Sequence, residues 1–222
     1  MRVVEPRRYI FGLTGYPLGH SMSPVIHKAL FEISGIDASY VMVETPPEEL
    51  GDSFRKSLSA MRGFNVTIPH KINIIRYLDE LSPRAKLFGA VNTVDVGEDN
   101  IVGHNTDCAG FLSALQMAGI ELGGNVLLLG SGGVARMIAF EAILAEADLT
   151  IAVRESGIPS ADKIKKEIKE KLNKDCKVIL LSEATGGYDL VINGTPVGMY
   201  PHMDACPVSK DVVATSKAAF DV

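Results

Sequence analysis

The stretch NVLLLGSGGVARM, residues 125–137, constrains the fold of this chain more than any other. Its apolar start is typical of a strand buried in a parallel sheet, and its glycines lead directly into a helical pattern. The residues at 130, 132 and 135 satisfy G-x-G-x-x-A, the pattern of a strand-to-helix turn that binds a dinucleotide. The alternative is a tight turn without a ligand. The residues expected at a cofactor here are Gly130, Ser131, Gly132, Gly133, Val134 and Ala135.

Strand and helix patterns alternate along the chain, which favours an α/β fold with mostly parallel sheets covered by helices. The alternation restarts near residues 103–106, so we expect two domains, residues 1–104 and 105–222. The expected strands cover residues 8–15, 38–45, 64–68, 91–96, 125–130, 148–153, 177–181, 188–194 and 217–222. The expected helices cover residues 23–35, 47–60, 72–78, 106–119, 133–147 and 161–172.

Composition excludes several classes of protein. Of 222 residues, 46% are hydrophobic and 22% are charged, which argues against a disordered or fibrous chain. The net charge of -5 provides no basic field for a nucleic acid. No run approaches the roughly 20 apolar residues that span a membrane. The three cysteines are widely spaced and suit neither a disulfide framework nor a zinc site, so we expect a reducing, cytoplasmic location and no metal.

The stretch FNVTIPHK, residues 64–71, is a second candidate for function. Val66 and Ile68 form an apolar face, while Thr67 offers a hydroxyl group at the end of the predicted strand. Pro69 ends the strand because it has no backbone donor. Lys71 then follows, either as a solvated lysine or as an amine directed into a cleft.

Further polar side chains gather where predicted strands and helices meet. Ligands of open α/β sheets bind outside the carboxyl ends of the strands, where these groups are expected to lie. As alternatives, Ser23 and Asp107 can cap helices and Asn92 can sit in a turn; we expect Ser23 to be an N-cap and Gly35 to end its helix. The set comprises Ser21, Ser23, Asn92, Asn105, Thr106 and Asp107.

The residues after the second nucleotide-binding strand bear on the choice of dinucleotide. An acidic side chain there holds the ribose 2′-hydroxyl group of NAD, whereas an arginine accepts the 2′-phosphate group of NADP. This chain has Arg154 followed by Glu155, so the pattern is mixed.

Six motifs together carry a resemblance that no single one carries. The chain resembles the shikimate dehydrogenase family along essentially its whole length and in the family's order. The motifs are GHSMSP, FNVTIPHK, GAVNTV, GHNTDCAGF, GSGGVARM and VINGTPVGM. The resemblance implies an N-terminal substrate-binding α/β domain and a C-terminal Rossmann-like domain with a cleft between them.

The resemblance also implies an activity: reversible, NADP-dependent transfer of a hydride between shikimate and 3-dehydroshikimate, in the chorismate pathway to aromatic amino acids. By matching positions, Lys71 and Asp107 are the expected catalytic pair. Ser21 and Ser23 match the residues that hold the substrate carboxylate group. The residues that match the groups at the ring hydroxyls are Thr67, Asn92 and Asp107. The further cofactor residues implied are Arg154, Thr195, Gly198 and Met199.

Two departures from the family pattern leave alternatives open. The family's Asn-Arg-Thr is replaced by Val153, Arg154 and Glu155, which keeps NAD and a broader quinate/shikimate dehydrogenase in consideration. The sequence ends at AAFDV, where relatives continue through helices that carry a substrate-binding glutamine. A folded but inactive or regulatory member is therefore a further alternative. We expect a monomer or homodimer that binds a small-molecule substrate and neither nucleic acid nor membrane.

Overall fold

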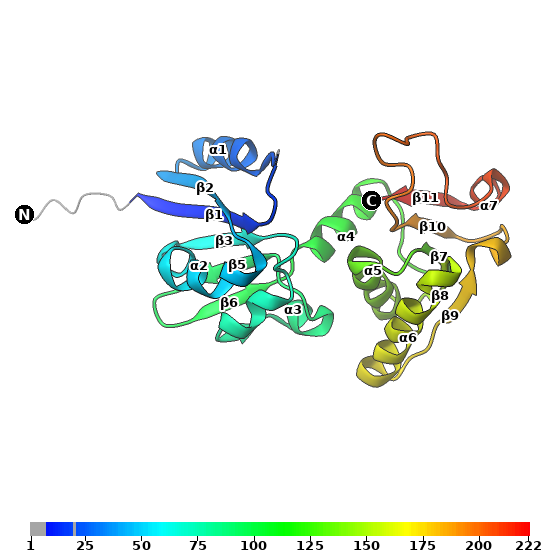
Figure 1. The fold of residues 1–222 in the computed structure, drawn as a ribbon. Helices are drawn as coiled ribbons and strands as arrows, with labels where there is room; N and C mark the ends of the chain where they lie inside the picture. Colours follow the sequence, from blue (N-terminus) through cyan, green and yellow to red (C-terminus); the bar gives the residue numbers. More distant parts are fainter. Residues whose placement is uncertain (1–7, 20) are drawn as a thin grey trace, which may run out of the picture. The chain divides into compact units, whose positions relative to one another are not determined.

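A computed structural model describes residues 8–19 and 21–222. The chain divides into two compact units, residues 1–106 and 107–222 (Figure 1). Each unit is built around its own sheet. The assignment of substrate to the first unit and cofactor to the second stays a prediction.

The sheet of the first unit has the strand order β2-β1-β3-β5-β6-β4. The sheet is mostly parallel, as expected, but β5 runs antiparallel to both of its neighbours. The reason is local: a turn across residues 97–100 joins β5 to β6, and so short a connection permits only antiparallel pairing. The strands are β1 (Tyr9–Gly15), β2 (Ala38–Glu44), β3 (Gly63–Val66), β4 (Glu80–Leu81), β5 (Thr93–Val96) and β6 (Ile101–His104).

Two predicted helices of the first unit take a different form in the structure. The predicted helix over residues 47–60 is instead a 3-10 turn, an α-helix and a second 3-10 turn, and the last break lies at Ser57, which leaves the helical region with φ -132° and ψ -54°. The predicted helix over residues 72–78 is a short 3-10 helix. The helices are α1 (Ser23–Ser34), η1 (Pro47–Glu49), α2 (Leu50–Lys56), η2 (Leu58–Ala60), η3 (Asn73–Tyr77) and α3 (Pro83–Phe88).

Helix α1 ends as predicted but begins differently. Gly35 follows it with φ 65°, a left-handed conformation that favours glycine. The prediction that Ser23 is the N-cap was wrong, because Met22 occupies that position and Ser23 is the first helical residue. The Ser23 N–H group is instead satisfied by the Ser21 hydroxyl oxygen, two residues earlier, at 3.2 Å.

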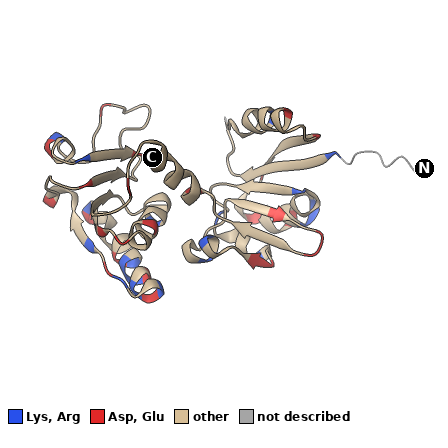
Figure 2. Cartoon of the chain, turned by 180° about the vertical axis from the view of Figure 1, so that it is seen from behind, with Lys and Arg blue, Asp and Glu red and all other residues tan. Residues whose placement is uncertain are grey.

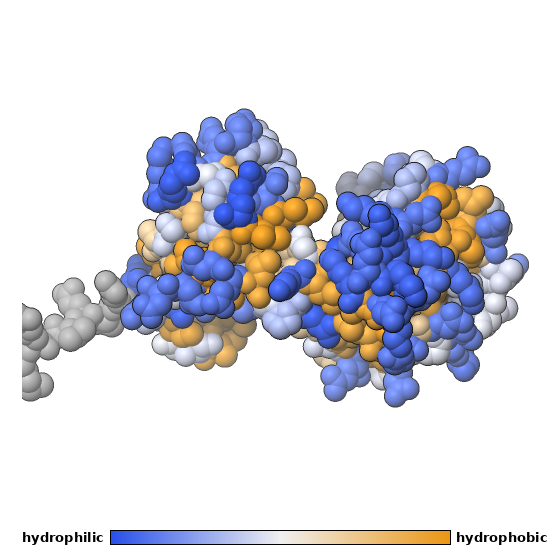
Figure 3. Space-filling model, turned by 90° about the horizontal axis from the view of Figure 1, so that it is seen from below, coloured by the Kyte–Doolittle hydropathy of each residue, from blue (hydrophilic) through white to orange (hydrophobic). Residues whose placement is uncertain are grey.

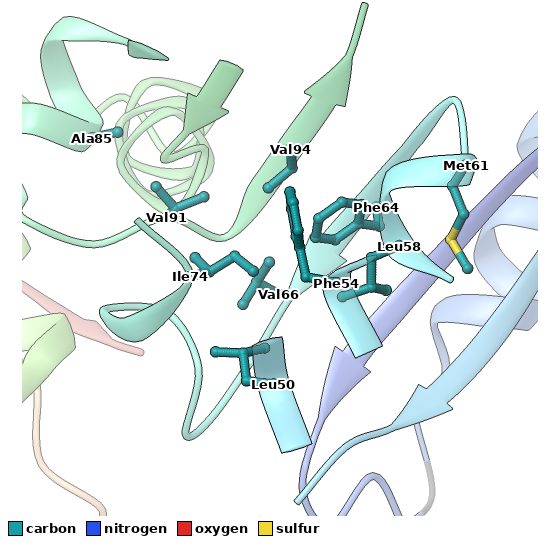
Figure 4. Close-up of a cluster of buried hydrophobic side chains, with 10 residues drawn as sticks. All are labelled: Leu50, Phe54, Leu58, Met61, Phe64, Val66, Ile74, Ala85, Val91 and Val94. Carbon is teal, nitrogen blue, oxygen red and sulfur yellow. The ribbon is translucent and has the colours of Figure 1, made fainter. Parts of the chain in front are cut away.

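The core of the first unit lies between α2 and the sheet, where apolar side chains converge (Figure 4). Phe54 of α2 packs edge to face against Phe64 of β3, with 6.4 Å between ring centroids. It also stacks on Tyr77 of η3 at 5.3 Å. The buried cluster comprises Leu50, Phe54, Leu58, Met61, Phe64, Val66, Ile74, Ala85, Val91 and Val94. This cluster packs against one face of β3 and so fixes the end of the strand and the start of the loop that follows.

The second unit has an all-parallel sheet with the order β11-β10-β7-β8-β9. The chain builds outward from β7 to one side and then returns to the other, so the order switches between β7 and β10. Its strands are β7 (Asn125–Leu129), β8 (Asp148–Val153), β9 (Lys177–Leu180), β10 (Leu190–Asn193) and β11 (Ala218–Asp221). Its helices are α4 (Asp107–Met117), α5 (Gly133–Leu144), η4 (Glu155–Gly157), α6 (Ile158–Leu172), η5 (Leu181–Glu183) and α7 (Lys210–Ala214).

Helix α6 is amphipathic, as its sequence predicts. Of the residues at helical spacing, Ile164 and Ile168 are buried and Leu172 is half-buried, while the lysines are exposed or half-buried. Lys and Arg recur along this helix (Figure 2). The surface on this side of the second unit is largely hydrophilic (Figure 3). The helix begins at Ile158, three residues before the predicted start, because Pro159 fits its first turn. Among the described residues, none of the helices has the length and apolar character required to cross a bilayer.

Candidate active site

Several of the polar side chains that the sequence singled out lie at one edge of the first sheet. Strands β1, β3 and β6 end there, and β5 begins there because it runs in the opposite direction. The loop after β1 therefore brings Ser21, the loop after β3 brings Thr67 and Lys71, and the residue before β5 is Asn92.

The two serines at the start of α1 contact each other. The Ser21 hydroxyl group donates to the Ser23 hydroxyl oxygen at 3.1 Å. A hydrogen bond between His27 Nδ1 and the Ser23 carbonyl oxygen, at 2.9 Å, fixes the imidazole one turn along the helix. Both serines are partly exposed, so their hydroxyl groups are available to a ligand.

Tyr40 of β2 connects these serines to the next strand, a role that the sequence reasoning missed. Its ring stacks on His27 at 4.0 Å, and its hydroxyl group donates to Asn65 Oδ1 at 2.7 Å. Burial raises the pKa of the Tyr40 phenol to about 12, while a hydrogen bond with the Ser23 side chain acts in the opposite direction. The phenol therefore stays neutral and able to donate at physiological pH. A tyrosine on an alternating strand gave no signal beyond that of a core residue.

Backbone hydrogen bonds hold the segment that carries Lys71. The Thr67 N–H group donates to the Thr14 carbonyl oxygen at 2.9 Å, which continues the β3 to β1 pairing past the end of β3. At the other end, the Val91 N–H group donates to the Lys71 carbonyl oxygen at 2.7 Å. Between them, the buried ring of His70 bonds through Nε2 to the Thr45 carbonyl oxygen at 2.7 Å. The main chain at Lys71 is thus fixed on two sides.

Asn92 is the centre of the polar network at this edge. Its Oδ1 accepts the Thr106 N–H group at 2.9 Å, and its Nδ2 donates to the Thr106 hydroxyl oxygen at 3.0 Å. Thr93 adds a hydroxyl donor to the same Oδ1 at 3.1 Å, and Asn65 Nδ2 donates to Thr93 at 3.1 Å. These bonds orient the Asn92 amide group without burying it completely.

Asp107 directly follows Thr106 and is the first residue of α4, in the second unit. A carboxylate group in the first turn of a helix is favoured by the helix dipole. Asn105, immediately before this pair, is buried and donates to the Ala90 carbonyl oxygen at 3.1 Å. Lys71 and Asp107 belong to different units, and their pairing stays a prediction.

In the second unit, the glycine-rich turn follows β7 at the switch point of the sheet. Gly130 has φ 104°, and a Cβ atom there would lie 2.8 Å from Thr195 Cγ2 and 3.1 Å from the Gly194 carbonyl oxygen. Glycine is therefore required for both conformation and space. Gly132 and Gly133 start α5 and are exposed, with nothing within 4 Å of a Cβ atom on either residue. Such an open, positively polarised helix start fits a pyrophosphate group.

Two further residues of the predicted cofactor set differ in exposure. Ala135 is completely buried, and its Cβ atom would be 3.1 Å from a Cβ atom added at Gly194. Its contribution is close packing of α5 on the sheet, the role of the third position in the glycine pattern. Val134 is exposed beside the helix start.

The loop after β10 is organised by Asn193, which the sequence reasoning did not single out. Its Oδ1 accepts both the N–H group and the hydroxyl group of Thr195, at 3.0 and 2.7 Å. Its Nδ2 donates to the Val197 carbonyl oxygen at 3.0 Å. Gly198 has φ 97°, and Met199 is exposed. A polar residue ending a buried strand was the available signal.

Arg154 follows β8 and is exposed, with Glu155 beside it in η4. Neither side chain is packed into the core, so both are accessible to a ligand at this end of the strand. The parallel order of the sheet puts the loops after β7, β8 and β10 at one edge, as a dinucleotide requires. The groups present in the second unit therefore fit such a cofactor.

Comparisons with known proteins agree with this architecture. A family model of the shikimate dehydrogenase substrate binding domain matches residues 13–94. The shikimate dehydrogenase (NADP(+)) of Methanocaldococcus jannaschii is 40% identical over 218 residues, covering 94% of this chain and 75% of that protein.

Solved structures are similar over nearly the whole chain. A crystal structure of a shikimate dehydrogenase in complex with NADP+ matches with a TM-score of 0.84 and 33% identity, over 96% of this chain and 84% of that one. The shikimate 5-dehydrogenase of Thermus thermophilus, in complex with NADP(H) and shikimate, matches with a TM-score of 0.83 and 34% identity. That match covers 96% of this chain and 78% of the other. The chain belongs to the shikimate dehydrogenase family.

Proposed function

We propose that this protein is an NADP-dependent shikimate dehydrogenase that interconverts shikimate and 3-dehydroshikimate. The observation that carries the proposal is the hydrogen-bonded set of half-buried polar side chains at one edge of the first sheet, in a chain of this family. Ser21 and Asn92 lie at the two ends of that set, which Tyr40 and Asn65 connect.

The substrate is a carboxylate with several ring hydroxyl groups, and the edge offers matching groups. Ser21 and Ser23 supply two hydroxyl donors for the carboxylate group. Thr67 and the amide group of Asn92 bind ring hydroxyl groups, with Asp107 as a further acceptor. Such groups discriminate strongly, because a substrate lacking a hydroxyl group leaves its protein partner unpaired.

Lys71 and Asp107 are assigned the transfer of the proton of the substrate hydroxyl group. In the oxidising direction, the pair would accept the proton that the substrate hydroxyl group loses as its carbon becomes a ketone. In the reducing direction, the Lys71 ammonium group stabilises the negative charge that develops on the carbonyl oxygen and returns the proton. General acid or base help of this kind contributes about 10² to 10⁴ in rate. Asp107 orients the ammonium group, and the two titrate as a coupled pair.

NADP, when bound, supplies the hydride acceptor or donor. Gly130, Ser131, Gly132, Gly133 and Val134 hold its pyrophosphate group at the start of α5. Arg154 would pair with its 2′-phosphate group, and Thr195, Gly198 and Met199 would hold its nicotinamide end. The positive φ angles and close approaches at Gly130 and Gly198 support this assignment.

The cellular location and the oligomeric state of the protein are also proposals. We propose a cytoplasmic enzyme, because three widely spaced cysteines do not suit a disulfide framework. We propose that it acts on its small-molecule substrate as a monomer or homodimer.

The experiment that tests the function is the initial rate of nicotinamide reduction by the purified chain with shikimate, measured side by side with NADP and NAD. We expect turnover with NADP, slower turnover with NAD, and none with an analogue that lacks the ring hydroxyl group to be oxidised. A folded protein that binds NADP and turns over neither cofactor would contradict the proposed activity.

A further inference from the structure

The glycine-rich loop is joined to the start of α6 by two reciprocal hydrogen bonds. The Ser131 hydroxyl group donates to the Gly157 carbonyl oxygen at 3.3 Å. The Ser160 hydroxyl group donates to the Ser131 carbonyl oxygen at 2.9 Å. Ser131 thus uses its side chain and its main chain to contact one segment, residues 157–160. We call this pair of contacts the serine clasp.

The Ser160 side chain forms its hydrogen bond with the glycine-rich loop rather than with its own helix. Ser160 is the third residue of α6, and the N-cap residue, Gly157, provides no side-chain cap. A serine in a first turn commonly bonds to backbone groups of the same turn, because its hydroxyl group competes locally for them. Here the hydroxyl group bonds to a residue 29 positions away.

The clasp determines the orientation of one peptide group. A peptide bond is planar and trans, so the carbonyl oxygen of Ser131 and the N–H group of Gly132 point in opposite directions. Because Ser160 holds the carbonyl oxygen, the N–H group of Gly132 is turned away from the start of α6. Gly132 is the N-cap of α5, where free N–H groups bind a phosphate.

The same contacts hold the segment that carries Arg154. The Gly157 N–H group donates to the Arg154 carbonyl oxygen at 2.8 Å. A Cβ atom at Gly157 would lie 3.0 Å from Val153 Cβ and 3.5 Å from Ser131 Oγ, so the segment packs tightly against both β8 and the glycine-rich loop. The clasp therefore joins the two loops that follow β7 and β8.

We infer that Ser160 is a positioning residue for the cofactor's pyrophosphate group, acting through the peptide between Ser131 and Gly132. This inference rests on the proposed function in that it assumes a dinucleotide at this loop. It assigns to Ser160, an exposed residue outside the glycine-rich motif, a share of the affinity for every ligand that contains the pyrophosphate group.

The test compares Ser160→Ala with Ser160→Thr, which keeps the hydroxyl group. Ser209→Ala is the matched control, since Ser209 is also an exposed serine at the start of a helix and makes no side-chain cap. Calorimetry measures the Kd of each variant for ADP, NAD and NADP. We expect Ser160→Ala to raise all three Kd values by about three- to tenfold, the factor that one neutral hydrogen bond carries. Ser160→Thr and Ser209→Ala should stay within about twofold of the parent chain.

Steady-state kinetics separate positioning from a general structural defect. At saturating NADP, kcat and the KM for shikimate should be unchanged in Ser160→Ala, and only the KM for NADP should rise. An unchanged Kd for ADP in Ser160→Ala, or a loss that Ser160→Thr does not restore, would overturn the inference. If the parent chain binds ADP but does not oxidise shikimate, the proposed function fails while the ADP comparison still decides the role of Ser160. A parent chain that binds none of the three ligands would overturn both.

Discussion

Asn92 and Thr106 hold each other through two complementary hydrogen bonds, 2.9 Å from the Thr106 N–H group to Asn92 Oδ1 and 3.0 Å from Asn92 Nδ2 to the Thr106 hydroxyl oxygen. The pair connects the residue before β5 to the second residue after β6, 14 positions apart in the chain. Asp107 follows immediately. The amide group of Asn92 therefore supports the main chain that leads to a predicted catalytic residue, besides being a predicted substrate contact itself.

Replacing Asn92 with Ala should remove both the substrate contact and this support. We expect kcat/KM for shikimate to fall by about 10- to 100-fold, from the loss of one to two hydrogen bonds, with the Kd for NADP unchanged. Asn100→Ala is a suitable control, because Asn100 is exposed in the turn between β5 and β6, at the opposite end of those strands. An Asn92→Ala variant with normal kcat/KM would remove Asn92 from the substrate site.

Replacing Lys71 with Ala should nearly abolish turnover. The expected loss in kcat is about 10²- to 10⁴-fold, since we propose that the ammonium group both carries the proton and stabilises the developing charge. Calorimetry should show an unchanged Kd for NADP. Lys86→Ala, at an exposed position of α3, is the matched control and should keep full activity. Residual turnover close to that of the parent chain would contradict the assignment.

Gly130 should not tolerate a side chain. In Gly130→Ala the new Cβ atom meets Thr195 Cγ2 at 2.8 Å, at a φ of 104° that costs on the order of 1–3 kcal/mol for other residues. We expect a lower free energy of unfolding in urea and weaker NADP binding. Gly123→Ala is the control, because nothing lies within 4 Å of a Cβ atom at Gly123. Equal unfolding midpoints for the two variants would show that the loop relaxes at no cost.

Arg154 and Glu155 should act in opposite directions on cofactor choice. Arg154→Ala should weaken NADP binding by about 10-fold or more, the effect of one charge-assisted hydrogen bond, and leave NAD binding nearly unchanged. Glu155→Gln should strengthen NADP binding, because a carboxylate group next to a 2′-phosphate group repels it. Calorimetric titration of both cofactors against each variant gives the comparison. A loss for NAD equal to that for NADP would place Arg154 elsewhere on the cofactor.

The buried thiol of Cys176 should make stability depend on alkaline pH. Burial raises its pKa from 9.0 to about 11, with Lys165 opposing the shift and Asp175 adding to it. The unfolded chain therefore loses this proton at lower pH than the folded protein does. The stability from this group is complete below pH 9.0 and declines as pH rises toward 11.

Urea unfolding between pH 8 and pH 11 would measure this dependence. Cys176→Ala should flatten the decline relative to the parent chain, whereas Cys206→Ala, at an exposed cysteine, should not. Parallel declines in the parent chain and Cys176→Ala would contradict a buried, protonated thiol.

Much of the architecture was predictable because its signals are local. The glycine pattern after an apolar run predicted the turn between β7 and α5, and the spacing of Ile164 and Ile168 predicted the buried stripe of α6. Three short elements, β4, α3 and α7, were not predicted, since two to six residues carry too little periodicity. Strand β6 was missed for the same reason, although its pairing with β5 determines where Thr106 lies.

The sequence by itself determined the fold class and the family and predicted the residues that meet a ligand, because glycine conformation, apolar runs and polar strand ends act over a few positions. Only the tertiary structure decided which other groups support the predicted site residues. Tyr40 reaches Asn65 across 25 positions, and Ser160 reaches Ser131 across 29. Contacts of this kind depend on strand order and on the direction of each strand, and no local pattern encodes a partner so far away along the chain.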